Sequence, residues 1–161
     1  MTHENRTSRI AGLVYLVVVL SGLFSLAWVP SRIVVADDLP ATMANMVAFE
    51  SLYRLGIASF LVNQVAFLVL PLVLYRLLRA VNPDIATIMV ALAATSVPIA
   101  LVSLAHRLDA LSLLTDAGYR SAFTADQLTA SVGRSLDAYR SGVRVASLFW
   151  GLWLLPFGYL V

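Results

Sequence analysis

Residues 55–75 read LGIASFLVNQVAFLVLPLVLY, a run without a charged side chain. A helix that crosses the hydrocarbon core of a bilayer needs about 20 predominantly apolar residues, and this run has that length. Arg54 precedes the run and Arg76 follows it. Basic side chains at both ends of a span can extend toward the lipid headgroups. This stretch therefore predicts a transmembrane helix.

Three further runs have the same character and predict spans at residues 10–29, 85–105 and 145–161. An alternative interpretation of the first run is a cleaved signal peptide, because residues 25–27 read SLA and resemble a small-x-small cleavage site. The first run is longer than the apolar core of a usual signal peptide, which favours a span.

The composition of the whole chain agrees with a membrane protein. Of its 161 residues 60% are hydrophobic and 12% are charged, whereas about 25% of a soluble domain is charged. The net charge is only +2, and no basic run is interleaved with aromatic residues, which argues against a nucleic-acid partner. Because the chain has no cysteine, it forms neither disulfides nor thiolate metal sites.

Two connecting segments, residues 31–50 and 107–144, are too long to be tight turns and are expected outside the membrane. In the first, Pro40 is suited to the first turn of a helix, and the apolar residues after it indicate a short surface helix. In the second, Thr124 and Gln127 have the spacing of a capping box. Apolar residues then recur at helical spacing, which predicts an amphipathic helix on the membrane surface that continues into the fourth span.

We therefore expect one domain, residues 1–161, with an all-α fold: a polytopic transmembrane helix bundle of four spans plus one or two interfacial helices. Four spans place both termini on the same side of the membrane. Arg6 and Arg9 before the first span, against Arg32 after it, indicate that this side is cytoplasmic. The opposite-side segments nevertheless carry more arginines in total, so the arginine bias is not uniform.

Several short motifs resemble those of a known family. Residues 50–56 read ESLYRLG, residues 75–79 read YRLLR, and residues 149–159 read FWGLWLLPFGY. In this order and spacing they resemble the domain-of-unknown-function family 4386 (DUF4386), a family of small bacterial polytopic membrane proteins. The resemblance implies a multi-pass protein of the bacterial cytoplasmic (inner) membrane and assigns no activity.

The resemblance also implies what an intact relative contains. Members of the family typically continue past the last motif with a basic loop and about two further spans, so about six spans are expected in intact relatives and the chain looks C-terminally truncated. The apolar end of the chain, which lacks polar anchors, agrees with this expectation. The chain departs from the family pattern at two positions, because relatives often carry an aspartate near Phe60 and a histidine near Tyr139.

Six polar residues in or beside the spans are candidates for ligand binding or for interhelical contacts: Asn63, Gln64, Glu50, Arg54, His106 and Asp109. The first two lie deep in the second span, where polar side chains either bond to a neighbouring helix or line a site. The next two are one helical turn apart, as in a headgroup anchor or a gate at a pore mouth. The last two share a helical face and suggest a polar cap or a carboxylate-oriented general base.

The sequence contains no catalytic motif and no cluster of metal ligands, so we expect no cofactor and no metal. It favours a non-enzymatic membrane protein that binds a lipid or a small apolar molecule, or that serves as an accessory subunit. The expected partners are membrane lipids and either further copies of the chain or a larger membrane complex. A small transporter or channel, hinged at Pro71 and Pro98, is the alternative. An intramembrane enzyme that uses His106 with Asp109 is a remote alternative.

Overall fold

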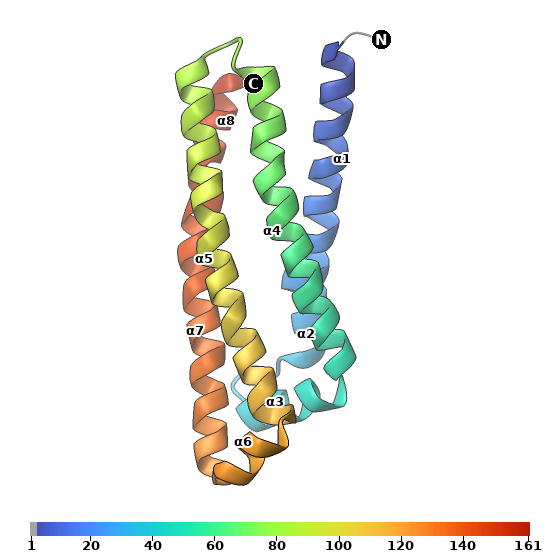
Figure 1. The fold of residues 1–161 in the computed structure, drawn as a ribbon, viewed down its shortest axis with the longest axis vertical. Coiled ribbons are helices and arrows are strands. Elements are labelled where there is room, and N and C mark those ends of the chain that lie inside the picture. Colours follow the sequence, from blue (N-terminus) through green and yellow to red (C-terminus); the bar gives the residue numbers. More distant parts are fainter. Residues whose placement is uncertain (1–2) are drawn as a thin grey trace.

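Four long helical stretches run along one axis in the computed structural model, which describes residues 3–161 and the side chains of residues 5–161. They contain the helices α1 (His3–Leu23), α4 (Glu50–Leu78), α5 (Pro83–Thr115) and α7 (Ala125–Leu152). Each stretch is long and apolar enough to cross a membrane. Figure 1 shows α1 beside α4, α4 beside α5, and α5 beside α7. Over the described residues the predicted all-α helical bundle is confirmed.

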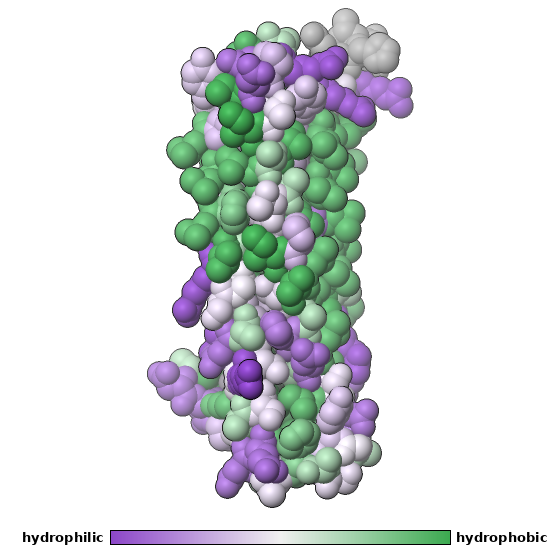
Figure 2. All heavy atoms as spheres, turned by 60° about the vertical axis from the view of Figure 1, so that its left-hand side comes forward, coloured by the Kyte–Doolittle hydropathy of each residue, from purple (hydrophilic) through white to green (hydrophobic). Residues whose placement is uncertain are grey.

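Apolar side chains form a broad band around the molecule, with polar residues at both ends (Figure 2). In α5 the apolar run 85–105 rises about 30 Å at 1.5 Å per residue, which matches the hydrocarbon core of a bilayer. The two ends of the chain lie at one end of the bundle, and α2, α3 and α6 lie at the other (Figure 1). Beyond the band, at that second end, the helices continue into a polar region.

α5 does not end where its charged residues begin, because the helix continues through Arg107 to Thr115. The short helix α6 (Ala117–Ala122) then reverses the chain, and α7 returns antiparallel along α5. The amphipathic helix expected in residues 107–144 is the first part of α7, and it lies along α5 rather than across the end of the bundle. Burial gives the physical reason: Val132 and Leu136 of α7 are removed from solvent in a core shared with α5.

The predicted capping box at the start of α7 is confirmed. The Gln127 N–H donates to the hydroxyl of Thr124, and the Thr124 N–H donates to the side-chain oxygen of Gln127. At its other end α7 stops at Leu152, and a short helix, α8 (Leu154–Leu160), continues the chain and packs against α5.

α1 continues through a wide turn into a further helix, beyond the predicted end of the first span at residue 29. The π-helical turn η1 (Phe24–Trp28) is followed by α2 (Val29–Ile33), and the Val29 N–H donates to the carbonyl of Phe24. Pro30 explains the turn, because proline lacks an N–H and its ring clashes with the carbonyl four residues earlier in a regular α-helix. The π-helical turn thus accommodates Pro30 without ending the helix.

The short helix expected after the first span is α3 (Leu39–Ala48), which lies across the end of the bundle (Figure 1). Asp38 caps it by accepting a bond of 2.8 Å from the Ala41 N–H, and Pro40 stands in its first turn. Asn45 ties α3 to α2 by donating to the carbonyl of Ile33 at 3.1 Å. α3 therefore forms a fixed cover over this end of the helices.

Candidate functional site: a cavity beside Arg107

α5 buries one face along its length, at positions spaced three and four residues apart. Over the second half of the helix this face consists of Ala100, Ser103, Leu104, Arg107, Ala110, Leu111 and Leu114. Arg107 is only 4% exposed, and among the described residues it is the one charged side chain that is buried. Charged residues are almost never fully buried unless they are paired, so Arg107 is the feature of the molecule that most requires an explanation.

Two tyrosines from other helices hold the guanidinium of Arg107. Its central carbon lies 4.4 Å from the ring centroid of Tyr53 in α4 and 5.3 Å from that of Tyr139 in α7. Both distances are within the range of a cation–π interaction. Tyr53 is itself buried, and Tyr139 packs edge-to-face on Phe60 with centroids 6.4 Å apart. The aromatic rings of α4 and α7 thus fix the position of a cation supplied by α5.

No carboxylate of the described chain lies within ion-pair distance of Arg107. Three carboxylates pair instead with a basic side chain on their own helix: Glu50 with Arg54 at 2.7 Å, Asp109 with His106 at 3.5 Å, and Asp137 with Arg140 at 3.1 Å. The Nη1 atom of Arg107 and the hydroxyl of Tyr53 are buried without a hydrogen-bond partner. The positive charge therefore has aromatic neighbours and no counter-charge.

Arg107 and both tyrosines line a cavity of about 250 Å³ between α2, α3, α4, α5 and α7. Much of the remaining wall is apolar and includes Ile33, Met46 and Leu136. Two other polar groups of the wall have partners: the Thr42 hydroxyl accepts from the Val35 N–H at 2.9 Å, and Arg140 bonds to Asp137. The cavity thus combines an apolar wall with two buried, unbonded donors.

The cavity lies at the border between the apolar band and the polar end of the molecule. Arg107 lies two residues beyond the apolar run 85–105, and the wall residues from α2 and α3 belong to the polar end. A molecule in the cavity would therefore lie where the apolar band meets the polar end of the bundle.

Asn63 and Gln64 lie elsewhere, in the apolar part of α4. Asn63 donates to the carbonyl of Val18 in α1 at 2.7 Å and to the hydroxyl of Ser21 at 3.3 Å. Gln64 donates to the side-chain oxygen of Asn63 at 3.2 Å, and its own oxygen is buried without a partner. Asn63 thus contacts α1, whereas Gln64 reaches another helix through no bond of its own.

The other four candidates lie on the surface of α4 and α5 as the two self-contained pairs described above. None of the six candidate residues lines the cavity beside Arg107. Neither Arg107 nor Tyr53 was among the candidates predicted from the sequence, although Arg107 follows the candidate His106 and Tyr53 lies in the motif at residues 50–56. The spacing from Ala100 through Leu104 to Leu111 was the signal that would have put Arg107 on the buried face.

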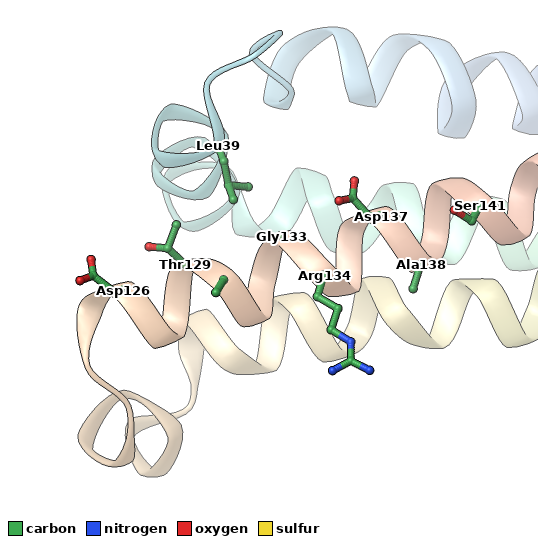
Figure 3. A pocket seen from close by; sticks show the side chains of 9 residues that line it. Leu39, Asp126, Thr129, Gly133, Arg134, Asp137, Ala138 and Ser141 are labelled. Carbon is green, nitrogen blue, oxygen red and sulfur yellow. The ribbon is translucent and has the colours of Figure 1, made fainter.

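A second hollow lies on the outer side of α7, where Leu39 overhangs the helix (Figure 3). It is an open groove of about 720 Å³. Its charged residues, Asp126, Arg134 and Asp137, are all exposed, and Figure 3 shows Arg134 pointing away from both aspartates. With no buried, unbonded group on its wall, this groove is a weaker candidate than the cavity.

Metal binding finds no support in the described part of the chain, where no three His, Asp or Glu side chains are grouped closely enough to share an ion.

The helices define a multi-pass helical membrane protein with a small cavity at one border of its apolar band. The chain belongs to the family described as "Domain of unknown function (DUF4386)", whose profile matches residues 10–161. No curated protein and no solved structure matches the chain. Of the two residues expected to depart from the family pattern, Phe60 and Tyr139, the second lines the cavity and packs edge-to-face on the first.

Proposed function

We propose that this membrane protein binds a small amphipathic molecule in the cavity beside Arg107 and performs no chemistry on it. The observation that carries the proposal is the pair of buried, unbonded donors, Arg107 Nη1 and the Tyr53 hydroxyl, on a largely apolar wall. A buried polar group without a partner costs about 1–3 kcal/mol, and more if it is charged. A ligand with a polar head and an apolar body would satisfy the donors and fill the space between them and the apolar wall.

The size and chemistry of the cavity support a small ligand that is not turned over. Its volume of about 250 Å³ is below the roughly 300–1,000 Å³ of pockets for drug-sized molecules. A nucleophilic mechanism needs a hydroxyl or amine activated by a neighbouring base. The Thr42 hydroxyl on the wall is instead bonded to backbone groups of Val35 and Asp38. Binding or an accessory role therefore fits these residues better than catalysis.

Native mass spectrometry from a mild detergent tests the proposal with two matched variants of α7. Leu136→Trp fills the cavity from a wall position, whereas Leu148→Trp places the same side chain on an exposed position of the same helix. We expect the native chain and Leu148→Trp to retain a stoichiometric amphipathic mass that Leu136→Trp has lost. A bare native chain, or a mass retained equally by both variants, would count against the cavity as the binding site.

We further propose a place for the chain in the cell, the cytoplasmic membrane of a bacterium with the N-terminus in the cytoplasm. Arg6, Arg9, Arg76 and Arg79 lie at that end of the bundle, which supports this orientation. Membrane lipids are the partners proposed for the exposed apolar side chains of the band, among them Leu13, Leu20, Val65, Val102 and Leu148. Further copies of the chain, or another membrane subunit, are proposed as alternative partners of the same surface.

A small transporter or channel is a second candidate, favoured by the prolines inside two neighbouring helices. Pro71 lies within α4 and Pro98 within α5, and each removes a backbone hydrogen bond at which a helix can bend. Flux through proteoliposomes tests this candidate, together with Arg54→Ala, which opens the Glu50–Arg54 pair. Flux that is the same with and without Arg54 would remove the version in which this pair acts as a gate.

A further inference from the structure

We infer that the ligand of the cavity is a single-chain carboxylic acid whose carboxylate binds Arg107 and the Tyr53 hydroxyl. This inference rests on the proposed binding function and names the chemical class of the ligand. It follows from the charge of Arg107, from its buried and unbonded donor, and from the volume of the cavity that it lines.

The charge on Arg107 requires a counter-charge. A guanidinium stays protonated in proteins, so burial cannot neutralise it as it can a lysine or a carboxylate. The rings of Tyr53 and Tyr139 attract the cation, but they carry no net charge. Since the chain offers no carboxylate within reach among its described residues, an anionic ligand is the partner that this arrangement lacks.

The number of free positive charges limits the charge of the head. Arg140 is the other cation on the wall, and its guanidinium already bonds to Asp137 at 3.1 Å. A phosphate monoester carries about −1.5 to −2 charges, which would leave negative charge buried and unbalanced. A carboxylate carries one negative charge and matches the planar fork of arginine. The head is therefore singly charged and planar.

The arrangement of the donors also suits a carboxylate. Arg107 and Tyr53 both line the cavity, and each has a buried group without a hydrogen-bond partner, Nη1 of Arg107 and the hydroxyl of Tyr53. The two side chains are neighbours, because the guanidinium lies over the Tyr53 ring. One carboxylate has two oxygens, so it can accept from both groups at once. The apolar wall at Ile33 and Leu136 would contact the first carbons of the ligand's hydrocarbon chain. The volume of about 250 Å³ is too small to enclose a glycerol headgroup with two acyl chains.

Three probes with the same eight-carbon chain test the inference by calorimetric titration of the full chain in a maltoside detergent. Octanoate carries one negative charge, 1-octanol carries none, and octyl phosphate carries more than one. We expect octanoate to bind at least about tenfold more tightly than 1-octanol, the effect of one charge-assisted hydrogen bond. Octyl phosphate is expected to bind more weakly than octanoate.

Variants assign the difference to Arg107. Arg107→Gln is expected to lower the affinity for octanoate to that of 1-octanol while leaving 1-octanol unchanged. Tyr53→Phe, which keeps the ring and removes the hydroxyl, is expected to weaken octanoate several-fold. Arg144→Gln, an exposed position outside the cavity, is the control and keeps the native preference. Retained binding of 1-octanol by Arg107→Gln shows that this variant is folded.

The outcomes separate the inference from the function on which it rests. If octanoate and 1-octanol bind equally to the native chain, the cavity binds amphiphiles and the carboxylate inference is overturned. Tighter binding of octyl phosphate than of octanoate overturns the singly charged head. If no probe binds saturably, the proposed function fails and takes the inference with it.

Discussion

A single arginine decides how the cavity can be used, because Arg107 stands at a position where its helix otherwise buries small or apolar residues. Desolvating a charged side chain costs several kcal/mol even after relaxation. Each cation–π contact returns about 0.5–2 kcal/mol. Without a ligand the two tyrosines therefore offset only part of the desolvation cost of Arg107. An apolar residue of similar length at this position would make the ligand-free protein more stable.

Replacing Arg107 with methionine should consequently stabilise the ligand-free protein. We expect Arg107→Met to raise the free energy of unfolding by about 1–4 kcal/mol, the range found when buried charged groups are replaced by packed apolar ones. Thermal unfolding in detergent after removal of bound small molecules measures this change. Arg144→Met, an exposed position in α7, is the control and should shift stability by less than about 0.5 kcal/mol. A lower melting temperature for Arg107→Met would show that Arg107 stabilises the empty protein.

The polar pair in the middle of α4 makes a different prediction for each residue. Asn63→Leu removes the bonds to Val18 and Ser21 of α1 and should lower stability by about 0.6–2 kcal/mol. Gln64→Leu removes only a bond to Asn63 and also removes an unbonded buried oxygen, so its effect should be smaller. Thermal unfolding of the single variants and of the double variant measures both. Unchanged stability of the double variant would contradict a role for this pair in holding α1.

At the scale of helices, the close approach of α5 and α7 fixes Arg107 of α5 relative to the cavity-lining residues of α7. Gly142 permits this approach, because a Cβ atom there would lie 2.8 Å from the Cβ of Ser103 and still closer to its hydroxyl oxygen. Ser103 has little freedom to move away, since its hydroxyl donates to the carbonyl of Ile99 at 2.6 Å. Helices packed this closely tolerate no added side chain at the contact.

Two glycines of α7 should therefore respond with opposite signs to the same substitution. Gly142→Ala is expected to destabilise by about 1–3 kcal/mol, because the new methyl group overpacks the contact with Ser103. Gly151→Ala meets nothing within 4 Å and should stabilise by about 0.5–1 kcal/mol through helix propensity alone. Melting temperatures of the two variants in the same detergent give the comparison. Equal shifts would mean that the two helices are not in tight contact at Gly142.

The helices also show which features the sequence could predict. Length and apolarity identified all four long apolar helical stretches, Pro40 indicated the start of α3, and the capping box identified the start of α7 at Thr124. The full length of α5 was missed, because the prediction placed residues from 107 onward in a connecting segment, whereas the helix continues to Thr115. The cavity was missed because Tyr53, Arg107 and Tyr139 meet only once three helices have packed, and nothing in their local sequence encodes that meeting.

At the scale of the whole molecule, the apolar band divides the chain into two polar ends with different contents. One end holds the turn between α4 and α5 around Ala80, and the other holds α3, α6 and the mouths of both hollows. Because residues of α2 and α3 line the cavity, it lies toward the second end, and we expect a ligand to reach it from that side of the membrane. If the N-terminus is cytoplasmic, as proposed, the ligand arrives from the outer face.

The absence of native cysteine allows this orientation to be tested with single introduced thiols. Ser121→Cys in α6 and Ala80→Cys in the α4–α5 turn occupy exposed positions at opposite ends of the bundle. We expect a membrane-impermeant maleimide to label Ser121→Cys in intact spheroplasts and Ala80→Cys only after permeabilisation. Leu148→Cys, within the apolar band, should resist labelling in both conditions. The reverse pattern would invert the proposed orientation, and labelling of both ends from one side would contradict the membrane-spanning arrangement.

The wide turn η1 makes the length of the chain at this point as important as its composition. An α-helix rotates about 100° per residue, so deleting one residue of Phe24–Trp28 would rotate everything beyond it by that angle. Val29 would lose its fit against Gly56, where the two residues are in close contact, and Ile33 would turn out of the cavity wall. The loop at residues 34–38 is not helical, so an insertion or deletion there would not rotate the faces of a helix. In η1, inserting or deleting one residue would instead rotate the faces of α2 and change the shape of the binding cavity.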